Sequence, residues 1–195
     1  MFSDKPLKNV LELIRPLGLQ TVELGTGNYP GDAHCALKEL LKSKPKRNEL
    51  LSMIKGEGLE ISALSCHGNP LHPDAAFAKS NHKVMMDTIK LANLLGVSVV
   101  NGFSGCPGSG PGDKKPNWVT CAWPPDYLEI LEWQWEKKVI PYWTKMHQVL
   151  KDAGLVFAFE IHPGFVVYNT ETLLKLRKAC GNTLGANFDP SHLFW

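Results

Sequence analysis

Short apolar runs alternate along the chain with stretches in which apolar residues recur at helical spacing. The first such stretch has apolar side chains at Leu7, Val10, Leu11 and Ile14, which fit one face of an amphipathic helix. The run TVELG at 21–25 then follows. It is short, rich in β-branched and apolar residues, and closed by glycine. A run of this kind is typical of a buried strand. The chain therefore opens with a predicted helix followed by a predicted strand.

The same alternation repeats four more times. Predicted helices cover residues 48–55, 80–95, 126–153 and 170–180, and predicted strands lie near residues 61, 97, 156 and 184. We expect the helix at 126–153 to be interrupted near Pro141, because a proline inside a helix removes a hydrogen bond and clashes with the preceding turn. Regular alternation of helices and buried strands predicts an α/β fold with right-handed crossovers and a parallel sheet.

Two parallel architectures fit this order: a doubly wound open sheet and part of a (β/α)8 barrel. A doubly wound nucleotide-binding domain normally carries its glycine fingerprint after the first strand. Here GTGNYPGDAH follows that strand, with different glycine spacing and with proline where the helix should open. The fingerprint is therefore missing, which weakens the doubly wound alternative.

Polar residues gather instead after every predicted strand. They are Asn28 and His34, His67 and Asn69, Asn101 and Ser104, Glu160 and His162, and Asp189 and His192. In a barrel the carboxyl ends of the strands form the single face on which active sites are built. We therefore predict a (β/α)8 TIM-barrel fold with residues 1–195 in a single domain.

Composition narrows the function classes. A formal net charge of +2 with scattered lysines argues against a nucleic-acid or anionic-membrane partner. The start MFSDKPLKNV lacks the apolar core of a signal peptide, and no run reaches the roughly 20 apolar residues of a membrane helix. The five cysteines are far apart without a CxxC pair, which favours reduced thiols. We expect a cytoplasmic protein that does not bind membranes.

The candidate chemistry centres on two carboxylates at strand ends. Glu160 ends the apolar run VFAFE, and Asp189 ends LGANFD directly before Pro190. A carboxylate in such a place is costly unless it is paired, hydrogen-bonded or metal-bound; the alternatives are a charge that leaves the sheet into solvent and an aspartate that opens a turn. His192 follows three residues after Asp189. Together these oxygen and imidazole ligands predict a site for a divalent cation, Mn²⁺, Mg²⁺, Co²⁺ or Zn²⁺.

Other motifs carry weaker signals. His67, in SCHGNP, could orient a substrate oxygen or simply cap a turn. Cys66 beside it is a poor nucleophile candidate, since successive strand residues point to opposite faces. The run GFSGC lacks the last glycine of a serine nucleophile elbow. The tryptophan-rich segment 117–143 could wall a sugar pocket, but packing of its helix is the role expected for most of its tryptophans.

Several stretches together resemble the sugar phosphate isomerase/epimerase family, the xylose-isomerase-like TIM barrels. They are VELGTGNYPGDAH, LSCHGNPLHPD, WPPDYLEILEWQWEKKVIPYW, the strand ending in Glu160, and NFDPSH, and the resemblance covers essentially the whole chain. It implies that Glu160 and Asp189 bind a divalent cation and that His192 contacts the substrate. It also implies that Glu160 can act as a general acid or base.

The resemblance also implies an incomplete barrel. A complete member starts with a first strand and ends with a seventh and an eighth, so this chain is expected to cover about strands 2 to 6. The seventh and eighth strands of the family supply a histidine and a second glutamate to the metal. Either the sequence is a piece of a longer protein or another chain completes its open sheet edges, and on the second alternative we expect a homo-oligomer.

The expected activity is that of a metal-dependent sugar, sugar phosphate or keto-polyol isomerase or epimerase acting through an enediolate, with a small sugar as partner. Glu160 and His192 are the expected catalytic residues. His67, His162 and His192 are the expected substrate-binding residues. One alternative is an endonuclease for abasic DNA, against which the near-neutral charge argues. The other is an inactive half-barrel that self-associates.

Overall fold

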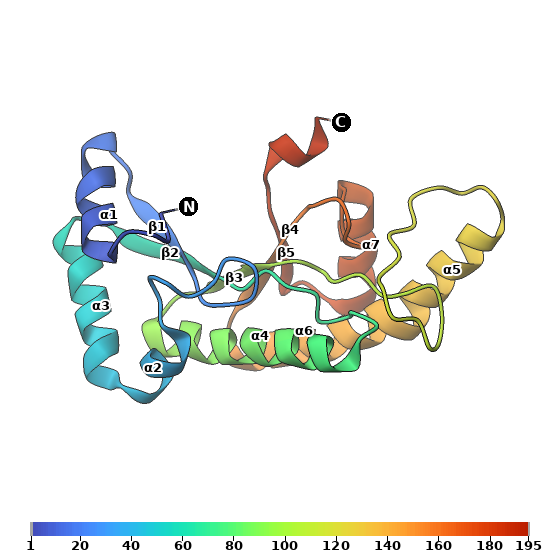
Figure 1. Ribbon diagram of the computed structural model, residues 1–195, viewed down its shortest axis with the longest axis horizontal. Coiled ribbons are helices and arrows are strands. Elements are labelled where there is room, and N and C mark those ends of the chain that lie inside the picture. Colours follow the sequence, from blue (N-terminus) through green and yellow to red (C-terminus); the bar gives the residue numbers. More distant parts are fainter. Residues whose placement is uncertain (1, 195) are drawn as a thin grey trace.

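The computed structural model describes residues 2–194, and its strands form one parallel sheet within that range (Figure 1). The strand order across the sheet, β1-β2-β3-β4-β5, is the order along the chain. The strands are β1 (Thr21–Gly25), β2 (Glu60–Ser65), β3 (Val99–Gly102), β4 (Val156–Glu160) and β5 (Leu184–Asn187). Each predicted strand is thus present.

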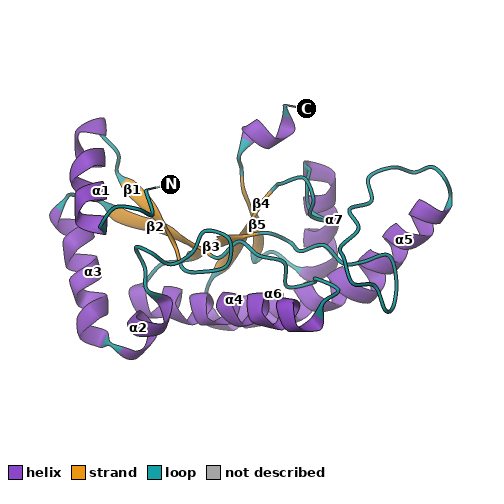
Figure 2. Cartoon of the chain, viewed as in Figure 1, coloured by secondary structure: helices purple, strands orange, loops and turns teal. Residues whose placement is uncertain are grey.

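The helices occupy the connections between the strands. They are α1 (Leu7–Ile14), α2 (Leu37–Lys42), α3 (Lys44–Gly56), α4 (Ala75–Leu95), α5 (Asp126–Gln134), α6 (Ile140–Ala153) and α7 (Thr170–Cys180), with short turns η1 (Arg15–Leu17), η2 (Trp135–Val139) and η3 (Pro190–Leu193). Parallel neighbours joined in sequence by right-handed crossovers place these helices on one side of the sheet, where Figure 2 shows them. This arrangement confirms the α/β class and forms part of a (β/α)8 barrel.

Two helices begin earlier than predicted, because a side chain caps each of them. α4 starts at Ala75 rather than near residue 80, where Asp74 Oδ1 accepts from two backbone N–H groups at 2.9 Å. α3 starts at Lys44 rather than residue 48, and the Ser43 side chain caps it. The six-residue helix α2 was not predicted. Caps satisfy the first free N–H groups of a helix and so extend it into polar sequence that apolar periodicity does not mark.

The predicted interruption near Pro141 is confirmed. Between α5 and α6 the chain makes a π-helical turn over Trp135–Val139, and Pro141 sits in the first turn of α6. Its missing N–H falls where the regular ladder is already broken. The turn leaves Gln134 and Trp135 both buried, at 1% and 2% exposure.

The core lies between the sheet and the helices. Trp143 of α6 is fully buried against Phe157 and Phe159 of β4, with ring centroids 5.0 and 4.6 Å away. Its indole Nε1 donates to the carbonyl of Ser104 at 2.9 Å, which ties the helix to the segment after β3. No helix among the described residues is long and apolar enough to cross a membrane.

Candidate metal centre

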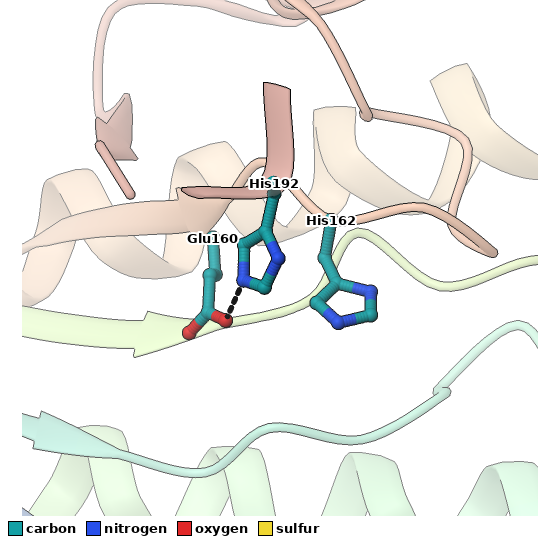
Figure 3. A group of neighbouring side chains, drawn as sticks. All are labelled: Glu160, His162 and His192. Carbon is teal, nitrogen blue, oxygen red and sulfur yellow. Dashed lines mark hydrogen bonds and ion pairs between the residues drawn. The ribbon is translucent and has the colours of Figure 1, made fainter. Parts of the chain in front are cut away.

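The carboxyl ends of β4 and β5 lie next to each other at the carboxyl-terminal end of the sheet and bring the predicted site residues together. Glu160 is the last residue of β4 and pairs in register with Asn187 of β5. The chain then turns through η3, capped by the Asp189 side chain, which accepts from Ser191 N–H at 2.8 Å. This turn carries His192 back toward Glu160, as Figure 3 shows.

Two imidazoles approach the carboxylate of Glu160. His192 Nε2 donates to Glu160 Oε1 at 3.0 Å. His67 Nε2, from the segment after β2, lies 2.8 Å from Oε2. That second contact is close enough for an ion pair but is not aligned as a hydrogen bond, so His67 Nε2 is buried without a hydrogen-bond partner among residues 2–194. Glu160 is therefore the charged partner of both imidazoles.

The electrostatics of this cluster favour an ionised glutamate. The contact with His67 does most to hold the pKa of Glu160 below its ordinary value, against the opposing effect of burial, and the hydrogen bond from His192 adds to it. The side chain is 21% exposed, so the carboxylate is largely shielded from water but remains accessible to a ligand at the carboxyl-terminal end of the strands. Glu160 is therefore a carboxylate at neutral pH, able to ligate a cation or to accept a proton.

His162 completes a group of three possible metal ligands. The ligand atoms of Glu160, His162 and His192 all lie within 4.8 Å of one another. His162 Nδ1 lies 2.5 Å from the carbonyl oxygen of Pro163, and since a carbonyl only accepts, Nδ1 carries the proton. This tautomer leaves a lone pair on Nε2. A backbone partner on the far nitrogen is the usual support of a histidine that binds a metal.

The donor set fits a divalent cation. One carboxylate and two imidazoles without a thiolate suit Zn²⁺, Mn²⁺ or Co²⁺, and ligand bonds of about 2.0–2.2 Å place opposed ligand atoms at most ~4.4 Å apart. The separation of up to 4.8 Å here needs only a small movement of the side chains. The described residues thus contain a possible metal site at Glu160, His162 and His192.

Asp189, the second predicted metal ligand, lies at the border of this group. Its Oδ2 is 3.6 Å from His192 Nε2, and its side chain is 46% exposed. Hydrogen bonds from Ser191 lower the pKa of its carboxyl group, so it too is ionised. Its part in metal binding stays a prediction. Conversely, His162 had been expected to bind substrate, and its place in the group makes it a candidate ligand as well.

An aromatic surface that sequence reasoning missed supports these histidines. Phe103 stacks on Phe165, with ring centroids 4.0 Å apart, and its ring also lies 4.7 Å from His67 and 5.1 Å from His162. A cavity of about 240 Å³ adjoins the group and is lined by His192, Trp118 and Tyr168. In the sequence, the position of Phe103 just after a predicted strand, in NGFSG, could have marked it as a site residue. Because phenylalanine is apolar, it was expected only to pack.

The remaining candidates lie elsewhere or are inert. His34 Nε2 contacts the carbonyl of Lys5. Cys66 is fully buried, and burial raises the pKa of its thiol to about 12. Both facts argue against a nucleophilic role, in agreement with the sequence analysis. Trp135 and Trp143 of the tryptophan-rich segment pack in the core as expected, whereas Trp123 is 73% exposed.

Comparison with known proteins agrees with the geometry. Residues 11–195 match the family described as xylose isomerase-like TIM barrel. The chain belongs to that family. An uncharacterized protein of Bacillus subtilis, YfiH, is 42% identical over 193 residues, which cover 97% of this chain and 61% of YfiH. The chain therefore spans about three fifths of the length of this curated relative.

Solved structures of the family share the fold at low identity. A D-tagatose 3-epimerase-like protein superposes with a TM-score of 0.65 at 19% identity, covering 98% of this chain and 64% of that one. A xylose isomerase-like TIM barrel protein from Mycobacterium smegmatis, in complex with magnesium, gives 0.63 at 16%, covering 98% and 60%. D-psicose 3-epimerase from Clostridium cellulolyticum H10, solved with D-tagatose, gives 0.60 at 16%, covering 91% and 55%.

Proposed function

We propose that the protein is a divalent-metal-dependent sugar isomerase or epimerase in which Glu160 moves the substrate proton. The observation that carries this proposal is the ionised carboxylate of Glu160 between His67 and His192 at the carboxyl end of the strands. Barrels build their active sites at this face. Family relatives named as sugar epimerases support the reaction class.

The residues of the chain divide the work between binding and proton transfer. Glu160, His162 and His192, with Asp189 beside them, would hold the cation. A cation bound there would polarise a carbonyl oxygen and its neighbouring hydroxyl, which stabilises negative charge on the substrate. Glu160 accepts the proton from the carbon that bears the hydroxyl, and returning it to the former carbonyl carbon gives isomerisation. Epimerisation needs, in addition, a second proton donor on the opposite face of the substrate. His67, whose Nε2 lies 2.8 Å from Glu160 Oε2, would orient a substrate oxygen beside that carboxylate.

The test is exchange of substrate protons with solvent. The full-length protein, supplied with Mn²⁺, is incubated in D₂O with a panel of ketoses, and deuterium at the carbon next to the carbonyl is followed by NMR. We expect incorporation with at least one ketose, and a loss of at least about 100-fold in Glu160→Gln, the size of effect typical for a general base.

Glu132→Gln is the matched control, because Glu132 is an exposed residue of α5 and is not among the residues of the candidate metal site. It should exchange protons at the rate of the unmodified protein. Absence of exchange with every ketose, or equal rates in Glu160→Gln and Glu132→Gln, would contradict the proposal.

A further inference from the structure

His67 stands on a segment without regular secondary structure, residues 66–69, which directly follows β2. Its side chain is 10% exposed and contacts Glu160 through Nε2 and the ring of Phe103 edge-on. These contacts are made by the imidazole and do not fix the backbone that carries it. The groups bonded to the backbone around His67 therefore decide where its ring lies.

The first of these groups is the side chain of Asn28, in the loop after β1. Asn28 Nδ2 donates to the carbonyl of Cys66 at 2.9 Å and to that of Asn81 in α4 at 3.4 Å. Since carbonyl oxygens only accept, the nitrogen of the amide has to face them, and its neighbours determine its orientation. The next residue adds a bond, because the Tyr29 N–H donates to the carbonyl of His67 at 2.9 Å. The loop after β1 thus binds two successive carbonyls, those of Cys66 and His67.

The second group is the side chain of Asn81, which is 5% exposed. Its Oδ1 accepts from the N–H of Asn69 at 3.0 Å. Gly68 permits this close approach, because a Cβ added there would lie 2.7 Å from Asn28 Nδ2 and closer still to Asn81 Oδ1. The segment is therefore held on both sides of His67, by the loop after β1 and by α4.

The backbone at residue 28 limits which side chain can do this. Asn28 has a left-handed conformation, with φ +57°, which asparagine adopts more readily than most residues other than glycine. Glycine would fit that backbone but has no side-chain donor. Aspartate would fit it as well, but its ionised carboxylate only accepts. Asparagine combines the backbone conformation with the N–H that the Cys66 carbonyl needs.

We propose that Asn28 is a positioning residue that holds His67 beside Glu160 and so orients the substrate oxygen. The effect on the reaction rests on the function proposed above, whereas the placement of His67 can be measured without any activity. Asn28 acts through the backbone of residues 66 and 67 and takes no part in proton transfer.

The placement is tested by NMR, through two histidines that flank one ring. The ring centroid of Phe103 lies 4.7 Å from that of His67 and 5.1 Å from that of His162. The protein is labelled at histidine and phenylalanine, nuclear Overhauser contacts between the rings are measured, and His67→Ala identifies the signals of His67. We expect Asn28→Gly to lose most of the His67–Phe103 contact. It should keep the His162–Phe103 contact, because the loop that carries His162 is held by other bonds.

Asn93→Ala is the matched control. It removes a bond of the same kind, from Asn93 Nδ2 to the carbonyl of Ala153 at 3.2 Å. Asn93 lies near the end of α4, shortly before β3 begins, and so at the opposite end of the strands from Glu160. Both ring contacts should persist in this variant. Asn28→Gly itself keeps the left-handed backbone, which glycine adopts without strain.

The effect on the reaction is tested by a double-mutant cycle on deuterium incorporation. Asn28→Gly should slow exchange between about tenfold and about 100-fold, the size of effect expected when a group near the reacting atoms is misplaced. In the His67→Ala background the same substitution should change the rate by less than about twofold, because no imidazole is left to position. Asn93→Ala should leave the rate unchanged in either background.

The inference is overturned if Asn28→Gly keeps the His67–Phe103 contact, or if it slows exchange equally with and without His67. Loss of both histidine contacts in Asn28→Gly would mean that Asn28 supports the fold in general, which overturns it too. Absence of exchange in the unmodified protein would contradict the proposed function alone, and the ring contacts of His67 then decide the positioning by themselves.

Discussion

At the scale of single residues, the decisive feature is a carboxylate that ends an apolar strand. β4 is buried over Phe157, Ala158 and Phe159, and Glu160 follows at the point where the strand leaves the core. Desolvation alone would raise the pKa of such a group. The imidazoles of His67 and His192 reverse that effect and keep it charged. The site thus keeps an ionised carboxylate in a partly buried position, which favours the binding of a cation.

The first prediction concerns metal binding by these residues. The protein is equilibrated with Mn²⁺ or Zn²⁺, dialysed, and the metal content per chain is measured by mass spectrometry. Glu160→Gln should lower the affinity for the metal at least about tenfold, because it removes the charged ligand of the site, the carboxylate that His67 and His192 contact. Asp189→Asn should also lower it if Asp189 is a ligand, as the sequence predicts.

Asp152→Asn is the control, since Asp152 is an exposed residue of α6 that pairs with Gln148. Equal metal content in Glu160→Gln and Asp152→Asn would remove the proposed centre. Full metal content in Asp189→Asn alone would confine the ligands to Glu160, His162 and His192.

At the scale of elements, the start of α7 holds the segment that carries His162. Asn169 and Thr172 form a capping box, in which Asn169 Oδ1 accepts from the Thr172 N–H at 2.8 Å. Just before it, Val166 N–H donates to the carbonyl of Gly105, and Val167 N–H donates to Ser104 Oγ at 2.9 Å. The loop between β4 and α7 is therefore tied both to its own helix and to the segment after β3. These hydrogen bonds restrain the loop that carries His162.

The capping box yields the second prediction. Asn169→Ala should lower the free energy of unfolding by about 1 kcal/mol, because it leaves the first N–H groups of α7 without their acceptor. Thr170→Ala, at an exposed neighbouring position that makes no capping bond, should change it by less than about 0.5 kcal/mol. Urea unfolding followed by circular dichroism measures both. Equal effects of the two substitutions would mean that the cap does not stabilise α7.

At the scale of the whole molecule, the described sheet has two strands that each pair on one side only, β1 and β5. Apolar side chains are also exposed near β5: Phe188, just after that strand, at 63%, and Val156 of the neighbouring strand β4 at 39%. Unpaired edges with apolar surface nearby promote pairing between chains. The expected self-association rests on this geometry and stays a prediction.

The third prediction tests that edge. We expect the 195-residue chain to sediment above the mass of a monomer, and Ala186→Lys to shift it toward the monomer, because a charged side chain on an edge strand opposes pairing. Asn182→Lys adds the same charge at an exposed position before β5 and should leave sedimentation unchanged. A monomer in all three proteins, or the same response to both substitutions, would argue against association through β5.

Much of the architecture followed from the sequence because it depends on local patterns. Strands such as 21–25 and 156–160 are marked by short apolar runs, and the break near Pro141 follows from proline chemistry. Helix starts were less accurate at α3 and α4, since Ser43 and Asp74 extend those helices by capping rather than by periodicity. The carboxylate at residue 160 stood out for the same local reason, a charge at the end of an apolar strand.

By itself the sequence determined the order of the strands and of the longer helices between them, the parallel barrel class and the list of polar residues that follow each strand, because these depend on spacing and burial along the chain. Only the tertiary structure decided which of them meet. His67 and His192 are separated by more than a hundred residues in the sequence yet both approach Glu160, while His34 contacts the carbonyl of Lys5 instead. The bonds of Asn28 and Asn81 to the segment around His67 were also invisible in the sequence, since a hydrogen bond between distant residues is a property of packed neighbours and not of residue type.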